Sequence, residues 1–317
     1  MAGEQKSLVE ALVSPKIGRN RRLEEIAALI EWRAIEPLVQ ALRPGETGRP
    51  PYDPLAMLKA LYLQTLYDLS DEGLEEALGD RVSFRRFCGF ALDVDTPDAT
   101  TLCRFRQAAA AAGVMDRCFA ALTGQLEARG LAARKGTLMD ATVIAAKHNK
   151  PPIEAGRGAK HPKEPDADWT YKAGKPLFGY KLHIGMDEGG LVRRAVFTSA
   201  KVYESEAADR LIVGDERAVY GDRAYPSKAR SERLRQAGIK DRIMRRADRW
   251  HPVLSPRLQR RNALIARRRA PVEAVFSALK RWYGLARARY ATLERNAARA
   301  IMAITLLNLC RARRRLA

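Results

Sequence analysis

The order of strand-like and helix-like segments after Gly136 constrains this chain more than any other feature. Three apolar or alternating runs come first, and Asp187-Glu-Gly-Gly190 between the second and third is typical of a hairpin turn. Helical and strand-like patterns then alternate. The expected strands are 136–147, 178–186, 191–198, 217–222 and 241–245, and the expected helices are 204–213, 226–236, 257–283 and 294–314. This order predicts an α/β domain with one mixed sheet flanked by helices.

The meander followed by alternating elements matches an RNase H-like core with a mixed five-stranded sheet. A polar segment of about 30 residues, at 147–177, separates the first two expected strands, and a loop of that length is usually functional or mobile.

Residues 1–130 have a different character, because leucine-rich helical periodicity predominates there. The expected helices are 21–42, 53–69, 71–79 and 98–112, with a Pro- and Gly-rich break at 43–51. Pro54 and Pro97 fit helix starts, and Ser70 fits a helix cap. We therefore expect an all-helical N-terminal domain (1–130), an α/β domain (131–290) and a basic C-terminal helix (291–317) packed on the α/β domain.

Three acidic residues stand out by their positions. Asp140 lies in the first strand-like run, Asp222 ends another short apolar run, and Glu273 lies in a helix-like stretch of the most basic third of the chain. Carboxylates on strand ends and a neighbouring helix are suited to holding Mg²⁺ against a phosphate. Each acid also has a structural interpretation, as a turn residue or as a first-turn acid that stabilises the helix dipole.

The positive charge is concentrated at the C-terminal end. The formal charge of +20 combines 57 Lys and Arg with 37 Asp and Glu. Residues 223–317 hold 26 basic and 5 acidic side chains, a net of +21, so residues 1–222 contribute −1. Nearly all the excess is Arg, which binds phosphate in a planar, bidentate way. A polyanionic partner is the leading explanation, and a supercharged soluble surface is the alternative.

The remaining composition excludes several classes. Cys88, Cys103, Cys118 and Cys310 form no closely spaced pair, which argues against a zinc or C-x-x-C redox site and favours reduced thiols. The N-terminus lacks the apolar core of a signal peptide. The longest apolar run, 300–309, is about half a membrane span and is expected to be a buried helix, so no membrane partner is expected.

Several segments together resemble bacterial insertion-sequence transposases of the DDE type, in the insertion sequence five group. The group's C-terminal signature is Tyr, two residues, Arg, three residues, Glu, six residues, Lys. Arg269, Glu273 and Lys280 match it, whereas Ala266 stands at the tyrosine position. The other matching segments are Phe84–Phe87, Thr96–Arg106, Asp140–Lys147, Asp166–His183 and Val219–Tyr225, and Val202-Tyr-Glu-Ser205 stands where Val-His-Asp-Ser is usual.

The resemblance implies a catalytic triad of Asp140, Asp222 and Glu273 that binds two Mg²⁺ ions, with Mn²⁺ as a substitute. It implies cleavage at the element's ends and strand transfer into target DNA. Recognition of the terminal inverted repeats is expected to involve the N-terminal domain, and a homodimer or higher oligomer is expected on the DNA. The protein would act in the bacterial cytoplasm at the nucleoid.

Further residues are candidates for contact with double-stranded DNA. Arg269 and Lys280 would hold phosphate near the metals, Lys175 and Lys181 would touch flanking DNA, and Trp169 would stack on an unpaired base. Arg104 and Arg106 belong to a helix-turn-helix-like arrangement around Ser83–Phe87. The alternatives are packing for Trp169 and a solvated amphipathic helix for Arg104 and Arg106.

Two other functions remain open from the sequence. A non-catalytic DNA-binding regulator would bind DNA without metal-dependent cleavage. A structure-specific nuclease of the same fold would cut DNA without joining it.

Overall fold

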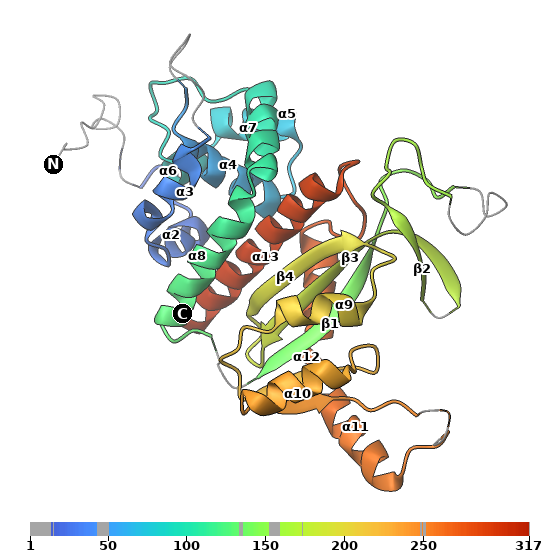
Figure 1. Cartoon of the computed structure of the whole chain (residues 1–317). Helices are drawn as coiled ribbons and strands as arrows, with labels where there is room; N and C mark the ends of the chain where they lie inside the picture. Colours follow the sequence, from blue (N-terminus) through green and yellow to red (C-terminus); the bar gives the residue numbers. More distant parts are fainter. Residues whose placement is uncertain are drawn as a thin grey trace. The chain divides into compact units, whose positions relative to one another are not determined.

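The computed structural model describes residues 14, 16–42, 51–132, 136–151, 159–172, 174–247, 249 and 252–316 (Figure 1). Most of the expected break at 43–51 and part of the 147–177 segment lie outside these residues. The chain forms two compact units, which are Met1–Leu126 with Thr305–Ala317, and Glu127–Ile304. The boundaries expected from the sequence, 1–130, 131–290 and 291–317, stay predictions. The structure groups Thr305–Ala317 with the first unit instead of with the sheet.

The elements of the first unit are helical throughout its described residues. In chain order they are α2 (Arg21–Ala28), η1 (Trp32–Ala34), α3 (Glu36–Gln40), α4 (Pro54–Leu66), α5 (Asp71–Asp80), α6 (Val82–Cys88), α7 (Ala99–Ala111) and α8 (Val114–Ala128). Three helix starts are fixed by side-chain caps, of which Ser70 was predicted; Pro54 begins α4 as expected, whereas Pro97 precedes the cap of α7 instead of lying in its first turn. Asp53 accepts from Ala56 N at 2.8 Å, Ser70 from Gly73 N at 2.8 Å and Asp98 from Thr101 N at 2.6 Å.

The helix expected at 21–42 is divided into three elements. Backbone bonds of the 3₁₀ type end α2, and the side chain of Glu31 then accepts from Arg33 N to start η1.

The sequence also did not predict α6 and α8. Gly113, with φ of 61°, ends the α7 segment in a conformation that favours glycine and allows α8 to begin at the next residue.

The second unit contains a six-stranded mixed sheet (Figure 1). Its strands are β1 (Thr137–Ala145), β2 (Asp168–Lys172), β3 (Lys175–Asp187), β4 (Val192–Ser199), β5 (Ala218–Gly221) and β6 (Lys240–Ile243). β3 pairs antiparallel with β1, β2 and β4, whereas β1, β5 and β6 are parallel neighbours. This alternation of antiparallel and parallel pairs is consistent with an RNase H-like domain.

The expected count of five strands was one too low, because β2 lies within the segment taken for a loop. Asp168–Lys172 alternates polar and aromatic side chains, but over only five residues inside a polar segment, which is too short a signal to distinguish a strand from a loop. It is held instead by pairing with the first five residues of β3, from Asp168↔Gly179 to Lys172↔Lys175. Lys160 fixes the approach to β2, since its ammonium group donates to Asp168 at 2.9 Å and to two nearby carbonyls.

One face of the parallel strands is covered by α9 (Glu204–Ala207), η3 (Ala208–Leu211) and α10 (Lys228–Gln236). A buried cluster there joins Met139 and Val219 of the sheet to Leu211, Tyr225 and Leu234. Burying such side chains stabilises the fold by about 1.5–3 kcal/mol each. This cluster fixes β1 and β5 side by side, and with them the acids that follow.

The helix expected at 257–283 is two helices, α11 (Pro256–Arg269) and α12 (Pro271–Trp282). The break falls at Ala270, directly before Pro271, which has no amide hydrogen to continue the helical bonding. α13 (Leu293–Leu316) follows, and its apolar run 300–309 is buried, as expected. No helix in the described part of the chain has the length and apolar character that a membrane crossing needs.

Candidate active site

Asp140 and Asp222 lie where β1 and β5 separate. The two strands pair only at Thr137↔Val219 and Leu138↔Tyr220. Asp140 lies two residues beyond Leu138, and Asp222 lies two residues beyond Tyr220. Parallel strands present their carboxyl ends at the same edge of a sheet, where open α/β sheets bind their ligands. The local topology therefore brings the two carboxylates to one place. Strand-end positions were expected for both acids. Asp222 directly follows β5, whereas Asp140 lies inside β1.

The carboxylate of Asp140 is partly buried and already has partners. Its Oδ1 accepts from Ala141 N at 2.8 Å, and its Oδ2 lies 3.1 Å from Nη2 of Arg269. Burial raises the pKa of Asp140, and the nearby Asp222 carboxylate raises it further, whereas the Arg269 guanidinium lowers it. The Arg269 guanidinium therefore favours the ionised form of Asp140.

Arg269 contacts β1 at the point where β1 and β5 separate. It is the last residue of α11, and its side chain is only 10% exposed. Besides the ion pair, its Nε and Nη2 donate to the carbonyl of Met139 at 3.3 and 3.2 Å. The guanidinium thus fixes both the backbone and the carboxylate of neighbouring residues on β1.

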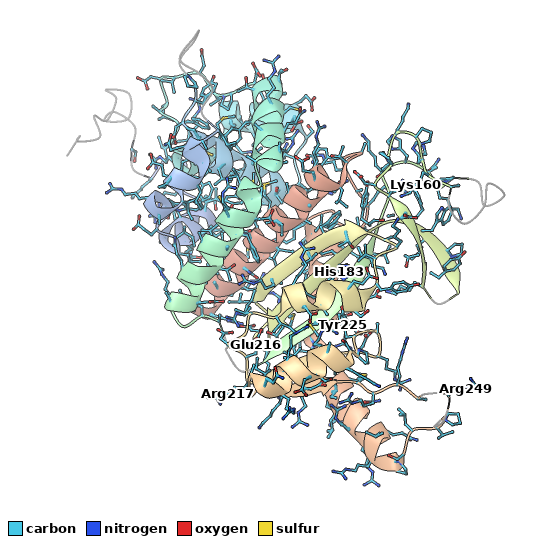
Figure 2. The ribbon with its side chains drawn as sticks, in the orientation of Figure 1. Lys160, His183, Glu216, Arg217, Tyr225 and Arg249 are labelled. Carbon is cyan, nitrogen blue, oxygen red and sulfur yellow. The ribbon has the colours of Figure 1, made fainter. Side chains whose placement is uncertain are left out.

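Asp222 starts a tight turn that ends in a buried tyrosine. Its Oδ1 accepts from Ala224 N at 2.7 Å, and its carbonyl accepts from Tyr225 N at 3.3 Å. The Tyr225 ring is fully buried, and its hydroxyl has no hydrogen-bond partner within the described residues (Figure 2). Burial raises the pKa of Tyr225, and the charges of Asp140, Asp222 and Glu204 raise it further. The phenol therefore lies within the field of three carboxylates.

A cavity of about 240 Å³ contains this edge of the sheet. Its polar lining comes from β1, β2, β3, the first residue of α9 and the turn after β5. The charged lining residues are Asp140, Lys172, Lys181, Glu204 and Asp222. The cavity is therefore lined by three acids and two lysines.

Glu204 was not among the residues predicted for this site. It lies 3.0 Å from the ammonium group of Lys181, which also donates to the carbonyl of Val202 at 2.9 Å. The signal in the sequence was an acid in the first turn of the helix after the meander, within Val202-Tyr-Glu-Ser205. Its neighbour Lys181 is buried, so this predicted DNA contact is a cavity residue with two internal partners.

Glu273 has a different setting. It lies in the first turn of α12, its side chain is exposed, and it has no ion pair or side-chain hydrogen bond within the described residues. Lys280, two turns later, is half-buried, and burial and the charge of Lys172 lower its pKa. Lys172 also acts on Asp140, so Lys280 is linked to the cavity through a shared neighbour.

The other predicted DNA contacts divide into free and engaged side chains. Trp169 donates from Nε1 to the carbonyl of Ala159 at 3.0 Å and packs on Phe178, whereas Lys175 is exposed. Arg104 is exposed on α7. Arg106 is 6% exposed, and its guanidinium is held by Asp71 at 2.6 and 2.7 Å, so it is a core residue and we withdraw it as a DNA contact.

The donor set is compatible with Mg²⁺, which prefers carboxylate oxygens and retains several waters. Within the described residues, no group of three His, Cys, Asp or Glu side chains is already gathered in a metal-binding arrangement. Asp140 and Asp222 supply two carboxylates at one edge of the sheet. The Tyr225 hydroxyl, which lies within their field, has no hydrogen-bond partner within the described residues. A third ligand would come from a side chain that turns toward the cavity.

The comparisons with known proteins identify two transposase domains in the chain. A transposase domain (DUF772) family matches residues 12–108, and the transposase DDE domain family matches residues 132–309, which include the sheet, α11, α12 and most of α13. No solved structure matches the chain. The DDE match covers more than half of the chain, and the protein therefore belongs to the DDE transposase family.

Proposed function

We propose that this transposase cuts DNA at the ends of its own insertion sequence and joins the released 3′ ends to target DNA, as a member of the insertion sequence five group. The observation that carries the proposal is the placement of Asp140 and Asp222, each two residues beyond the last paired residues of β1 and β5. Both acids line one cavity at the carboxyl edge of the sheet.

Asp140, Asp222 and Glu273 are the proposed metal ligands, for two Mg²⁺ ions or for Mn²⁺ in their place. Ions held there supply Lewis acidity at the attacking and leaving oxygens of a phosphodiester. The residues themselves keep the ligands in place. Arg269 orients Asp140 and favours its ionised form, and the turn bonds from Ala224 and Tyr225 fix Asp222.

The lysines of the cavity provide the positive charge that a DNA phosphate needs. Lys172 of β2 lines the cavity, and its charge acts on Asp140 and on Lys280 of α12. A phosphate bound beside Lys172 would be held by positive charge close to the carboxylates. Such prearranged charge is worth most when it matches the charge that develops in the transition state.

Glu273 and Glu204 are the two candidates for the third carboxylate. Glu273 carries the signature spacing with Arg269 and Lys280, and its exposed side chain has no partner to release within the described residues. Glu204 already lines the cavity, but it is paired with Lys181 at 3.0 Å. We propose Glu273 as the third ligand and treat Glu204 as the comparison.

The DNA partners follow from the same reaction. We propose that the N-terminal unit contributes to recognition of the terminal inverted repeats, with Arg104 on α7 as a contact. Joining two element ends requires them to be held together, so we propose a homodimer or higher oligomer on DNA, acting at the bacterial nucleoid.

The test is an end-cleavage assay on a labelled duplex that spans one end of the element, with Mg²⁺ or Mn²⁺. Wild type is compared with Asp222→Asn, Glu273→Gln and Glu204→Gln. We expect 3′-end cleavage by wild type, its loss in Asp222→Asn and Glu273→Gln, and retention of DNA binding in both. A second duplex in the reaction reports strand transfer.

Each alternative has its own outcome. Binding without cleavage by wild type with either metal would make the protein a regulator, and cleavage without joining would make it a nuclease. Loss of cleavage in Glu204→Gln but not in Glu273→Gln would transfer the third ligand to α9.

A further inference from the structure

A second, larger groove lies along α11, outside the cavity just described. Its volume is about 1000 Å³, and Tyr220 of β5, Arg242 of β6 and the side chains of α11 line it. Six arginines line this groove, against one acid, Glu188. They are Arg242, Arg257, Arg260, Arg261, Arg267 and Arg268. Such a one-sided lining requires an explanation.

The helical repeat places the α11 arginines on one stripe. At about 100° per residue, Arg257, Arg260, Arg261, Leu264, Arg267 and Arg268 fall within an arc of roughly 120°. The buried Asn262 and Ile265 fall beside this arc, with Arg269, which contacts Asp140. We call the five arginines of this arc the α11 stripe. One edge of α11 thus contacts the sheet and the active site, and the stripe follows the adjoining surface.

The α11 stripe is poorly compensated inside the protein. Arg257, Arg260 and Arg267 are exposed and have no ion pair or hydrogen bond within the described residues. Glu188 compensates Arg268 alone, at 2.8 Å. Arg261 donates to the carbonyls of Ile243 and Asp241 at 2.9 and 3.0 Å, and burial lowers its pKa, with the charges of Arg245 and Arg242 lowering it and that of Asp241 raising it. Exposed like charges this close raise the free energy of the unbound protein, and a polyanion would lower it.

We propose that the α11 stripe binds the phosphate backbone of double-stranded DNA and leads it toward the active site. The inference rests on the proposed function for the identity of the DNA, but the groove is separate from the catalytic cavity. From Arg257 to Arg268 the helix rises about 17 Å, which equals about five base pairs of duplex at 3.4 Å each. At its end, Arg269 contacts Asp140, so the bound backbone would approach the carboxylates.

The composition of the groove favours duplex over other polyanions. Single strands are bound by aromatic side chains on which bases stack, and Tyr220 is the one aromatic residue among the groove's described lining residues. A membrane surface requires a continuous apolar face beside the cations, and here Leu264 is the one exposed large hydrophobic residue of α11. Arginines with one acidic neighbour and few apolar ones are suited to backbone phosphates, which carry no sequence information.

The test removes three charges from the α11 stripe and three from elsewhere on the same unit. The stripe variant is Arg257→Gln, Arg260→Gln, Arg267→Gln, and the control is Arg194→Gln, Arg217→Gln, Arg295→Gln. The control arginines are also exposed, have no partner within the described residues and do not line the groove (Figure 2 labels Arg217). Both variants carry the same net charge, so a nonspecific charge effect would weaken them equally.

Affinity is measured by fluorescence anisotropy in EDTA with a 20-base-pair duplex of arbitrary sequence, between 50 and 200 mM KCl. We expect the stripe variant to bind at least about tenfold more weakly than the control at 50 mM, with a log–log salt slope smaller by about 2.7 for three lost phosphate contacts. Thermal melting should show both variants folded. Deuterium exchange of α11 in wild type should slow when duplex is added.

Equal affinities and slopes for the two variants would overturn the proposal. It would also fail if a single-stranded oligonucleotide or vesicles of anionic phospholipid bound the α11 stripe more tightly than duplex. Because the assay contains no metal, it is independent of cleavage. If wild type never cleaves but the stripe variant loses duplex affinity, this inference stands and the proposed function is refuted. If wild type cleaves but the stripe variant binds duplex as tightly as the control, the proposed function stands and this inference is refuted.

Discussion

The guanidinium of Arg269 lies 3.1 Å from the carboxylate of Asp140 and also donates to the carbonyl of the preceding residue, Met139. One side chain at the end of α11 therefore holds both the acid and the backbone that carries it. Burial raises the pKa of Asp140, and the Arg269 guanidinium lowers it. Arg269 therefore favours the ionised form of Asp140, which is the form proposed to bind metal.

Replacing Arg269 by Gln should move the acidic limb of the cleavage–pH profile to higher pH. The variant removes the charge that lowers the pKa of Asp140, while burial and Asp222, which raise it, remain. More alkaline conditions are then needed to ionise the acid. The measurement is the single-turnover cleavage rate against pH with DNA prebound. Arg281→Gln, an exposed guanidinium stacked on Trp282, is the control, and an unshifted limb in Arg269→Gln would contradict the prediction.

The sequence predicts the sheet and two of the site residues because their signals are local. Asp140 and Asp222 each follow an apolar strand segment, and the meander is visible in residue alternation. β2 has only five residues, in which Trp169 and Tyr171 alternate with polar side chains, and its pairing with β3 is visible only in the tertiary structure. To identify Glu204 and the α11 stripe as site residues, one must know which faces of neighbouring elements line a cavity or groove. The spacing of residues along the chain does not contain that information.

Arg106 illustrates the opposite error, in which a local pattern suggested an exposed contact. Arg106→Ala should lower the free energy of unfolding by about 3 kcal/mol, because Asp71 would lose its bidentate partner in a largely buried site. Arg104→Ala, on the same helix but exposed, should leave stability within about 0.5 kcal/mol. Chemical denaturation distinguishes them. Equal stability of the two variants would show that the buried pair contributes nothing.

Arg230 connects the turn after Asp222 to the helix that carries Glu204. It is 2% exposed, donates to the carbonyls of Tyr225 and Ser205, and pairs with Asp209 at 2.6 Å. Arg230→Met should therefore destabilise the fold by about 3–5 kcal/mol and slow cleavage in any protein that remains folded.

Arg233 provides the matched control for Arg230. It pairs with the same Asp209, at 2.5 Å, but its side chain is 57% exposed. Exposed ion pairs contribute about 0–1 kcal/mol, so Arg233→Met should change the melting temperature little. A loss in Arg233→Met as large as that in Arg230→Met would indicate that Asp209, and not the carbonyl bonds, is what matters.

His183 should make folding sensitive to acid. Its ring is fully buried on β3, Nε2 lies 3.0 Å from Thr198 Oγ1, and burial lowers its pKa from 6.5 to about 4, with Lys181 and Arg210 lowering it and Glu204 opposing them. The folded pKa is depressed, so the unfolded chain binds the proton first as pH falls. Stability is thus intact above about pH 6.5 and declines toward pH 4 by up to about 3 kcal/mol.

His183→Gln gives the comparison for that prediction, since glutamine keeps a hydrogen-bonding side chain without titrating in this range. Urea denaturation at several pH values should show a smaller decline between pH 6.5 and 4 for the variant than for wild type. Parallel curves for the two proteins would assign the acid sensitivity to other groups.

Tyr225 and Tyr180 are both fully buried, but only one of the two hydroxyls is satisfied within the described residues. Tyr180 donates to the carbonyl of Ala291 at 3.4 Å, whereas the Tyr225 hydroxyl has no partner beside three carboxylates. Tyr180→Phe should therefore cost about 1 kcal/mol, and Tyr225→Phe should be neutral or stabilising by about 1 kcal/mol in the metal-free protein. Denaturation in EDTA measures both. Equal destabilisation would show that the Tyr225 hydroxyl is bonded in solution, for which an ordered water among the carboxylates is the simplest source.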